Sequence, residues 1–323
     1  MHAWRAHEYG PPEVLRWEEL PEPPLSEGQL RVRVAAAAVN FPDALLIAGT
    51  YQIKPEPPFI PGMEVAGVVV ESRAAGFPVG AGVALLLQAT GGYATHVVAH
   101  ASQAFLVPED MSFEDAAALT VTYQTSWFAL HRRARLAAGE TLLVHAGAGG
   151  VGSAAIQLGK AAGARVIATA GGAAKVDVCR KLGADVAVDY TSEDFVEVVK
   201  RETGGRGADV VYDPVGGDVF DKSTKCIAFE GRIVVIGFTS GRFPTARANH
   251  LLVKNYGVLG LHWGLYRMHD PQSMVDCQRE LYRLYGEGKI RPLLGERAAM
   301  SDAPAALARV AGRGSVGKVV LVP

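Results

Sequence analysis

Three glycines with a fixed spacing carry the most specific chemical signal in this sequence. Gly147, Gly149 and Gly152 form a G-x-G-x-x-G motif between the apolar run TLLVHA and the alanine-rich stretch VGSAAIQLGKAAG. In a strand, loop and helix unit, the first glycine allows a tight turn, the second lets the backbone approach a pyrophosphate, and the third lets the helix pack on the strand. The motif therefore predicts dinucleotide binding at a helix start. The alternative is a tight turn that binds nothing.

The residues after this motif bear on the choice between NAD(H) and NADP(H). Sites selective for NAD(H) carry an Asp or Glu about 20 residues past the glycines, and it bonds the ribose 2′-hydroxyl. No acidic residue occurs from Ser153 to Val176, whereas Lys175 lies at the start of the next helical stretch. A carboxylate that would repel a 2′-phosphate is missing and a cation is present, so NADPH is the expected cofactor. The alternative for Lys175 is an ordinary solvated lysine.

Two patterns along the chain predict an α/β protein with two domains. Over residues 123–263, six apolar runs alternate with amphipathic stretches of helical length, which is typical of a doubly wound parallel sheet. Residues 1–122 carry short β-branched runs punctuated by Pro and Gly, and residues 264–323 end in a similar run, which indicates a barrel-like sheet. We therefore expect a doubly wound, Rossmann-type domain inserted into a domain built on a barrel-like sheet.

Composition and charge exclude several classes of protein. The chain has 323 residues, of which 49% are hydrophobic and 20% charged, so it can bury a sizeable core. Lys plus Arg is 32 and Asp plus Glu is 33, so the net charge is −1, and neither nucleic acid nor a membrane is an expected partner. Three scattered cysteines and a start without an apolar signal segment indicate a cytoplasmic protein.

Several segments together resemble one protein family. They are VHAGAGGVGSAAIQLGKAAGARVIATA, LGADVAVDY, VVYDPVGGDVF and GRIVVIGF, with VNFPDALLIAGTYQ and PFIPGMEVAGVV nearer the start. In combination, and over essentially the whole chain, they are similar to the NADPH:quinone oxidoreductases, the zeta-crystallin-like, zinc-free branch of the medium-chain dehydrogenase/reductase superfamily. The resemblance implies a GroES-like catalytic domain, a Rossmann domain, NADPH as cofactor and a homodimer.

The resemblance also implies roles for individual residues in holding cofactor and substrate. For Tyr190 the alternative is an aromatic at a sheet edge, and for Phe238 it is a core residue. By position, the implied residues are Gly149, Gly150, Val151 and Gly152 for the pyrophosphate; Lys175, Tyr190 and Arg313 for the 2′-phosphate; Thr125, Gly237 and Phe238 for the nicotinamide half; and Asn40 and Tyr51 for the substrate. Gly147 is expected to serve the cofactor site as the turn glycine of the motif.

No metal site is expected. Zinc alcohol dehydrogenases of the same superfamily place a Cys and a His where this chain has Asn40 and Met63. An amide and a thioether do not replace a thiolate and an imidazole as zinc ligands. His96 and His100 lie in a strand-like run, where four residues span about 13 Å, too far for both side chains to share one ion.

The expected reaction is hydride transfer from NADPH to a quinone or a similar conjugated carbonyl. Tyr51 would donate a hydrogen bond or a proton to the acceptor and Asn40 would orient it; relatives with a further Tyr have it where this chain has Leu45. The alternative for Tyr51 is a residue that merely lines a cleft. Reduction of an enone, alkenal or enoyl thioester remains open, as does a low-turnover NADPH-binding role of the crystallin-like or RNA-binding kind.

The run GVLGLHWG bears on assembly. It is apolar and is expected to form the last strand of the Rossmann sheet, at its edge. Unpaired N–H and C=O groups at a sheet edge invite pairing with another chain. The sequence therefore predicts a C2 homodimer.

Overall fold

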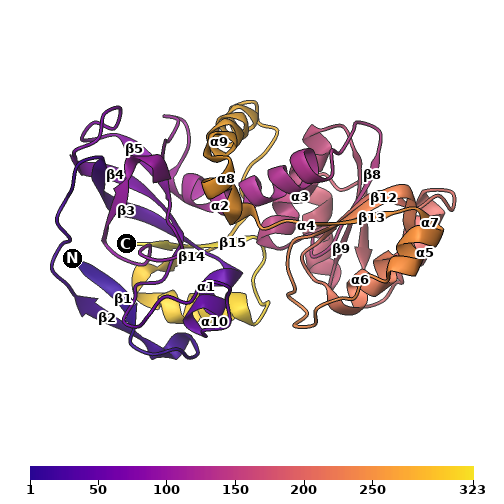
Figure 1. Cartoon of the computed structure of the whole chain (residues 1–323), viewed down its shortest axis with the longest axis horizontal. Coiled ribbons are helices and arrows are strands. Elements are labelled where there is room, and N and C mark those ends of the chain that lie inside the picture. The colour runs from indigo at the N-terminus through magenta and orange to yellow at the C-terminus, as the bar shows by residue number, and fades with distance from the viewer. The chain divides into compact units, whose positions relative to one another are not determined.

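The computed structural model describes all 323 residues, which form two compact units. The barrel unit comprises residues 1–121 and 292–323, and the sheet unit comprises residues 122–291 (Figure 1). The α/β class, a barrel-like sheet plus a doubly wound sheet, is confirmed. The chain returns to the barrel unit at Pro292, however, and not at residue 264. The helix α9 (Pro271–Gly286) belongs to the sheet unit, where buried Gln124 donates a hydrogen bond of 2.7 Å to Gln278 of α9.

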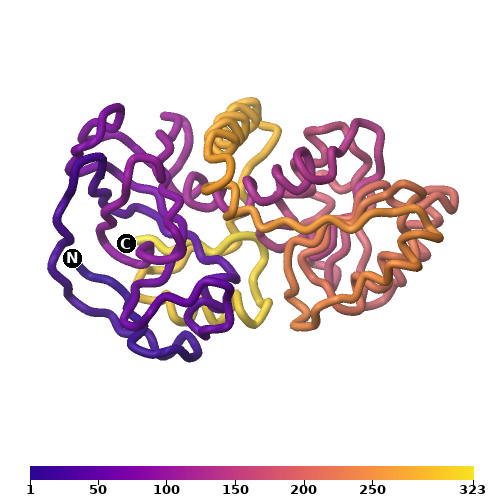
Figure 2. The backbone as a smooth tube through the Cα atoms, viewed as in Figure 1, coloured from indigo at the N-terminus to yellow at the C-terminus, as the bar shows by residue number.

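A largely antiparallel sheet of seven strands forms the barrel unit, in the order β14-β15-β3-β4-β5-β7 with β6 also paired to β3. Its final strand returns to pair with β3, so segments far apart in sequence lie side by side (Figure 2). The small ribbon β1–β2 lies apart from this sheet. The strands are β1 (His2–Ala6), β2 (Leu15–Glu19), β3 (Gln29–Val39), β4 (Glu64–Ser72), β5 (Gly82–Leu86), β6 (His96–His100), β7 (Ala104–Leu106), β14 (Leu294–Ala299) and β15 (Lys318–Val322).

Two short helices close the core of the barrel unit. The helices α1 (Phe41–Ile47) and α10 (Ala303–Ala311) pack against each other, and both contribute fully buried side chains such as Leu46 and Leu307. These side chains join the alternating inward residues of β3, β4 and β5 in one apolar cluster. Burying a leucine contributes about 1.5–3 kcal/mol, so this cluster is what holds the strands together.

Six parallel strands in the order β10-β9-β8-β11-β12-β13 form the sheet unit. The uninterrupted apolar runs arise because both faces are covered: α3 and α4 lie on one face and α5 and α6 on the other (Figure 1). The strands are β8 (Thr141–Val144), β9 (Arg165–Ala170), β10 (Val186–Asp189), β11 (Ala208–Asp213), β12 (Ile227–Val235) and β13 (Gly257–Gly260). The helices are α3 (Gly150–Ala161), α4 (Ala173–Lys181), α5 (Phe195–Glu202), α6 (Gly217–Ser223), α7 (Ala248–Lys254) and α8 (Tyr266–His269), besides α9 and the helix α2 (Phe113–Trp127), which begins in the barrel unit.

None of the helices combines the length and the apolar composition that a membrane span requires. The three cysteines, Cys179, Cys226 and Cys277, are buried and free. Burial raises the pKa of each thiol, so all three are held as neutral thiols.

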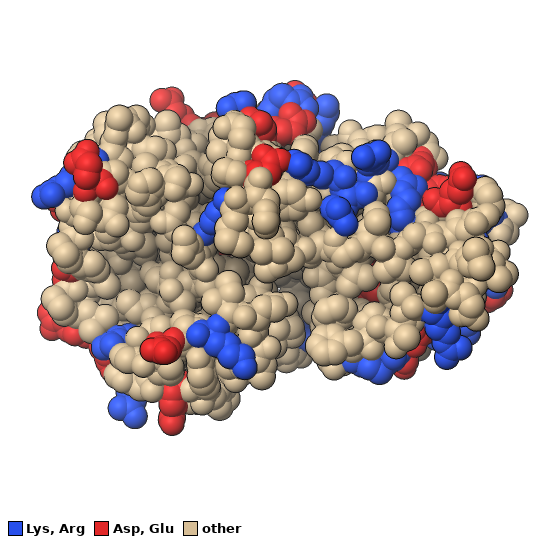
Figure 3. Space-filling model, viewed as in Figure 1, with Lys and Arg blue, Asp and Glu red and all other residues tan.

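Charged side chains of both signs occur over each unit on the face drawn in Figure 3, in keeping with the net charge of −1. Many exposed charges are paired along one helix, as Arg283 is with Glu280 and Glu287. Exposed pairs of this kind contribute only about 0–1 kcal/mol each, so they do not determine the fold.

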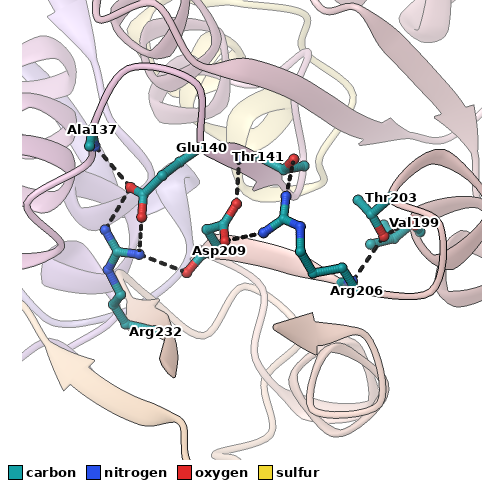
Figure 4. Close-up of polar contacts among 9 residues, drawn as sticks. Ala137, Glu140, Thr141, Val199, Thr203, Arg206, Asp209 and Arg232 are labelled. Carbon is teal, nitrogen blue, oxygen red and sulfur yellow. Dashed lines mark hydrogen bonds and ion pairs between the residues drawn. The ribbon is translucent and has the colours of Figure 1, made fainter. Parts of the chain in front are cut away.

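A charged network fastens strands of the sheet unit near their amino ends (Figure 4). Arg232 on β12 donates to both carboxylate oxygens of Glu140 at 2.7 and 2.8 Å, and to the carbonyl of Asp209 at 3.1 Å. The carboxylate of Asp209 accepts from the backbone N–H of Thr141 at 2.7 Å and pairs with Arg206. Burial opposes ionisation of Glu140, but the bonds from Arg232 and from the N–H of Ala137, with the nearby positive charges, together lower the pKa of this carboxyl. The network therefore connects the loop before β8 to β11 and β12.

Replacing Arg232 by Met should lower the free energy of unfolding by about 1.5–3 kcal/mol, because a partly buried carboxylate loses its hydrogen-bonded partner. Urea unfolding at neutral pH measures this loss. The matched control is Arg180→Met, which breaks an exposed pair with Asp177 and should cost under about 0.5 kcal/mol. Equal losses in the two variants would contradict a structural role for the network.

Candidate active site

The glycine motif forms the loop at the carboxyl end of β8, and each glycine meets a different constraint. A Cβ on Gly152 would lie 2.1 Å from the carbonyl oxygen of Ala146, and one on Gly147 would lie 2.8 Å from Sγ of Cys179. A Cβ on Gly149 would meet only the oxygen of Ala146, at 3.3 Å. Gly147 and Gly152 are thus required by packing, whereas Gly149 keeps one side of the loop clear for a ligand.

The start of α3 offers a set of uncapped hydrogen-bond donors. Gly149 is the N-cap and supplies no side-chain cap, so the N–H groups of Gly150, Val151 and Gly152 lie in a first turn without intrahelical acceptors. These N–H groups and the helix dipole suit an anion. A clear backbone face beside uncapped donors fits a dinucleotide pyrophosphate.

Two hydroxyls that the sequence reasoning missed hold α2 against this loop. Oγ of Ser126 donates to the carbonyl of Thr122 at 2.9 Å or to that of Val151 at 3.1 Å, and lies 2.9 Å from the hydroxyl of Tyr212. Burial raises the pKa of Tyr212, which stays a neutral phenol. Thr125, expected along the nicotinamide half, is the neighbour of Ser126 and is partly exposed. The bond of Ser126 to Val151 joins α2 to the first turn of α3, and contact of Thr125 with the cofactor stays a prediction.

A buried carboxyl orders the carboxyl end of β11, the neighbour of β8 at the point where the strand order reverses. Oδ1 of Asp213 accepts from the N–H groups of Val215 and Gly216 at 2.8 and 2.9 Å, while Oδ2 is buried without a partner. Burial raises the pKa of Asp213 despite these two bonds. Ligands of doubly wound sheets bind at this reversal point, so the turn after β11 borders the expected cofactor crevice.

Gly237 and Phe238 follow β12 at the same edge of the sheet. The ring of Phe238 is about one third exposed and packs edge-on against Phe243, with centroids 4.8 Å apart. It also lies 3.1 Å from the position of a Cβ on Gly216. Phe238 is therefore not enclosed in the core, and contact of Gly237 and Phe238 with the cofactor stays a prediction.

Two of the three residues expected around the 2′-phosphate, Tyr190 and Lys175, lie at the loop between β9 and α4. The hydroxyl of Tyr190 lies 2.7 Å from the position of a Cβ on Gly171, so its half-exposed ring covers this loop. Lys175 lies in the first turn of α4, two residues inside the helix start. The structure thus places Tyr190 and Lys175 beside one loop.

Asp189 also reaches this loop, and the sequence reasoning overlooked it because it comes from the next strand. Its Oδ1 accepts from the N–H of Gly172 at 2.9 Å and from the N–H and hydroxyl of Thr191 at 3.0 and 2.6 Å. The hydroxyl of Thr191, with the two N–H groups, lowers the pKa of Asp189. By these hydrogen bonds, the carboxylate holds the loop before α4 to the end of β10. Arg313 belongs to the barrel unit, on an exposed stretch with φ 60°, and its role stays a prediction.

In the barrel unit, the two expected substrate residues flank a buried carboxyl. Asn40 is the N-cap of α1 and its N–H donates to Oδ2 of Asp43 at 2.8 Å, which also accepts from the hydroxyl of Tyr93 at 2.8 Å. Burial raises the pKa of Asp43 to about 7, against the lowering effect of these two bonds. Burial and then the nearby Asp43 raise the pKa of Tyr51, so this half-buried phenol stays protonated and able to donate.

The side chain of Asn40 is locked in a second buried group. Its Oδ1 accepts from Nζ of Lys318 at 2.6 Å, and its Nδ2 donates to Oε1 of Glu64 at 2.9 Å. Lys318 and Glu64 pair directly at 2.8 Å, and both are almost fully buried. The sequence pointed to Asn40 but to neither charged partner, because these lie 24 and 278 positions away in the chain.

The histidines of β6 lie in separate surroundings. His96 is 3.2 Å from the hydroxyl of Thr95, and His100 is exposed and bonds Ser102 at 2.8 Å. Met63, beside Glu64, is buried. No three His, Cys, Asp or Glu side chains are grouped to hold a metal ion.

Two family profiles match the chain. Residues 26–109 match "Alcohol dehydrogenase GroES-like domain", and residues 150–278 match "Zinc-binding dehydrogenase". The first falls in the barrel unit and the second in the sheet unit, which identifies the two as a GroES-like domain and a Rossmann domain.

Curated proteins and solved structures are similar over nearly the whole chain. The quinone oxidoreductase-like protein 2 homolog of Nematostella vectensis is 38% identical over 92% of this chain and 82% of its own length. The 2-haloacrylate reductase of a Burkholderia species is 32% identical over 98% and 97%. The structure of Escherichia coli quinone oxidoreductase complexed with NADPH superposes with a TM-score of 0.92 at 31% identity and covers both chains in full.

The buried Asp43 should make stability depend on pH in an unusual direction. Its folded pKa is raised from 3.8 to about 7, so between about pH 4 and 7 the folded chain holds a proton that the unfolded chain has lost. The free energy of unfolding should therefore fall as the pH rises through this window, by up to about 1.4 kcal/mol per pH unit. Asp43→Asn keeps an acceptor for Tyr93 and removes the ionisation, so this slope should vanish in urea unfolding at about pH 5, 6 and 7. Asp189→Asn, a control whose carboxyl has a lowered pKa, should retain the slope; parallel curves for the parent and Asp43→Asn would refute the assignment.

Proposed function

Because this chain belongs to the quinone oxidoreductase-like family of the medium-chain dehydrogenase/reductase superfamily, we propose that it is an NADPH-dependent reductase of quinones or similar conjugated carbonyls. The observation that carries the proposal is the uncapped start of α3 beside a loop that Gly149 keeps clear. Lys175 and the lack of an acidic residue from Ser153 to Val176 favour the phosphorylated cofactor.

The residues of the chain divide into cofactor-holding and acceptor-holding groups. When bound, NADPH supplies the hydride. The N–H groups of Gly150, Val151 and Gly152 would hold its pyrophosphate, and Lys175 would bind its 2′-phosphate. Tyr51, which stays protonated, would donate to the acceptor oxygen as negative charge develops there.

Two classes of acceptor fit this chemistry. Both quinones and α,β-unsaturated carbonyl compounds accept a hydride and then need a proton. Resemblance to the quinone oxidoreductases supports the first class, and similarity to a 2-haloacrylate reductase over nearly the whole chain supports the second. A reduced quinone takes its proton from water more readily than an enolate formed in the site does. Tyr51 would therefore be needed as a proton donor more for enones than for quinones.

The proposal is tested by following NADPH oxidation with a panel of quinones, enones and enoyl thioesters. Turnover with at least one class, and faster with NADPH than with NADH, is the expected result. Tight NADPH binding with no turnover on any acceptor would instead favour a low-turnover NADPH-binding role, crystallin-like or RNA-binding.

We also propose that two copies pair through β13, an edge strand of the sheet unit. Helix α7, which leads into β13, exposes Leu252 and Val253 by 77% and 81%. Phe229 is 69% exposed, and the next residue, Glu230, donates its N–H to the carbonyl of Asn255 between α7 and β13. A second copy would cover these apolar groups and pair the free strand edge.

Light scattering at micromolar concentration should give the mass of a dimer. Leu252→Lys should shift the protein toward monomer, because a charge would be buried in the interface. Val79→Lys, at a 65% exposed position of the barrel unit, is the control and should leave the mass unchanged. A monomeric parent would rule out the dimer.

Replacing Lys175 by Ala should weaken NADPH binding about 10- to 150-fold, since a charge-assisted bond contributes about 1.5–3 kcal/mol. NADH has no 2′-phosphate, so its affinity should barely change. Fluorescence titration measures both constants. Lys181→Ala, at the far end of the same helix, is the control for general loss of positive charge. If both cofactors lost affinity equally, Lys175 would have a structural role.

Tyr51→Phe removes only the hydroxyl, so NADPH affinity should hold while turnover falls. The loss should be about 10-fold or more with enones and smaller with quinones, because quinones take protons from water. Steady-state kinetics with both acceptor classes measure it. Tyr9→Phe, whose hydroxyl bonds the carbonyl of Pro55, is the control. Turnover within about twofold of the parent for both classes would show that Tyr51 only lines a cleft and takes no part in the reaction.

A further inference from the structure

The carboxamide of Asn40 lies between a cation and an anion. These two charges determine which of its terminal atoms is oxygen and which is nitrogen. The ammonium of Lys318 only donates hydrogen bonds, so the Asn40 atom 2.6 Å from it must be oxygen. The carboxylate of Glu64 only accepts, so the Asn40 atom 2.9 Å from Oε1 must be nitrogen. The two charges thus select one of the two orientations of the amide.

Further hydrogen bonds hold the side chains of Lys318 and Glu64 in place. Lys318 also donates to the carbonyl of Val39 at 3.2 Å, and the second oxygen of Glu64 accepts from the N–H of Val121 at 2.8 Å. Their side chains are 3% and 1% exposed. Neither charged group can contact a substrate directly. Lys318 and Glu64 can therefore influence a substrate only through Asn40.

We infer that Lys318 is a positioning residue that makes Asn40 a hydrogen-bond donor to the acceptor. The inference rests on the proposed reductase function and deepens it. Oδ1 of Asn40 accepts from Lys318, and one Nδ2 proton is donated to Glu64. The second Nδ2 proton therefore remains available to donate a hydrogen bond to the acceptor. Asn40 is buried, with 5% of the residue exposed, so few groups other than a bound acceptor could reach this proton.

A donor is what the reaction requires at this position. A carbonyl acceptor gains negative charge on its oxygen as hydride arrives at carbon, and an N–H aimed at that oxygen stabilises the charge. The flipped amide would present a carbonyl oxygen and repel the same charge. Lys318 would therefore promote hydride transfer to the acceptor without touching it.

The kinetic test separates orientation from stability. Lys318→Met leaves the buried carboxylate of Glu64 unpaired, so both stability and turnover should fall. Adding Glu64→Gln removes the unpaired charge, and the double variant should regain most of the lost stability. Its kcat with 1,4-naphthoquinone should still be at least about 10-fold below the parent, because a neutral carboxamide in place of the Glu64 carboxylate accommodates both orientations of the Asn40 amide.

Two further measurements define the outcomes. NADPH affinity should be unchanged in the double variant, because the residues proposed to hold its pyrophosphate lie on α3. Arg31→Met removes another buried cation of the barrel unit, paired with Glu71 and away from Asn40, so it should lose stability and keep kcat. Recovery of kcat to within twofold of the parent, together with stability, would overturn the inference and leave Lys318 a purely structural residue.

Magnetic resonance tests the orientation without turnover. The chain has three asparagines, Asn40, Asn249 and Asn255, and the last two are exposed. With ¹⁵N-asparagine labelling, one carboxamide should show a proton protected from exchange by its bond to Glu64, and its signals should shift or split in the double variant. Three rapidly exchanging carboxamides would overturn the assigned orientation. A parent that reduces no acceptor but shows the protected proton would refute the proposed function and leave the orientation standing.

Discussion

One buried ion pair, Lys318 with Glu64, sets how the elements of the barrel unit meet. Two charges removed from water require partners on every side, and here those partners are the end of β3, the N-cap of α1 and the backbone of α2. The pair therefore fixes the final strand, β4 and two helices at one point. The apolar cluster around it supplies most of the stability, but apolar contacts alone tolerate small shifts that a hydrogen-bonded buried ion pair does not.

Local patterns predicted the parts of the fold that local physics determines. The apolar runs of the doubly wound sheet and the glycine motif are contiguous in sequence, so their period and spacing were sufficient. The return to the barrel unit at Pro292 was not predictable in the same way. Helix α9 belongs to the sheet unit through contacts such as that of Gln278 with Gln124, and nothing in the composition of α9 reveals that partner.

The site shows the same division. Gly149 and Lys175 were proposed from the motif and the residues that follow it, because motif, strand and helix are adjacent in sequence. Asn40 and Tyr51 were proposed from resemblance to a family, and their contact with a substrate stays a prediction. Asp189, Ser126 and Lys318 were missed because each acts on a residue far away in the chain, across 254 positions for the pair of Lys318 and Glu64. Buried polar partners of this kind become visible only when the unpaired groups of a folded chain are accounted for.

The division of the barrel unit into two stretches affects the order in which the chain can fold during synthesis. The sheet unit is one continuous stretch, residues 122–291, and it is made in full before β14 and β15 emerge. Until then β3 lacks its neighbour β15, and the carboxylate of Glu64 has no ammonium beside it. The nascent barrel unit is thus left with an open strand edge and an uncompensated charge while the sheet unit is already complete, and this is the interval in which a newly made chain is most exposed to aggregation.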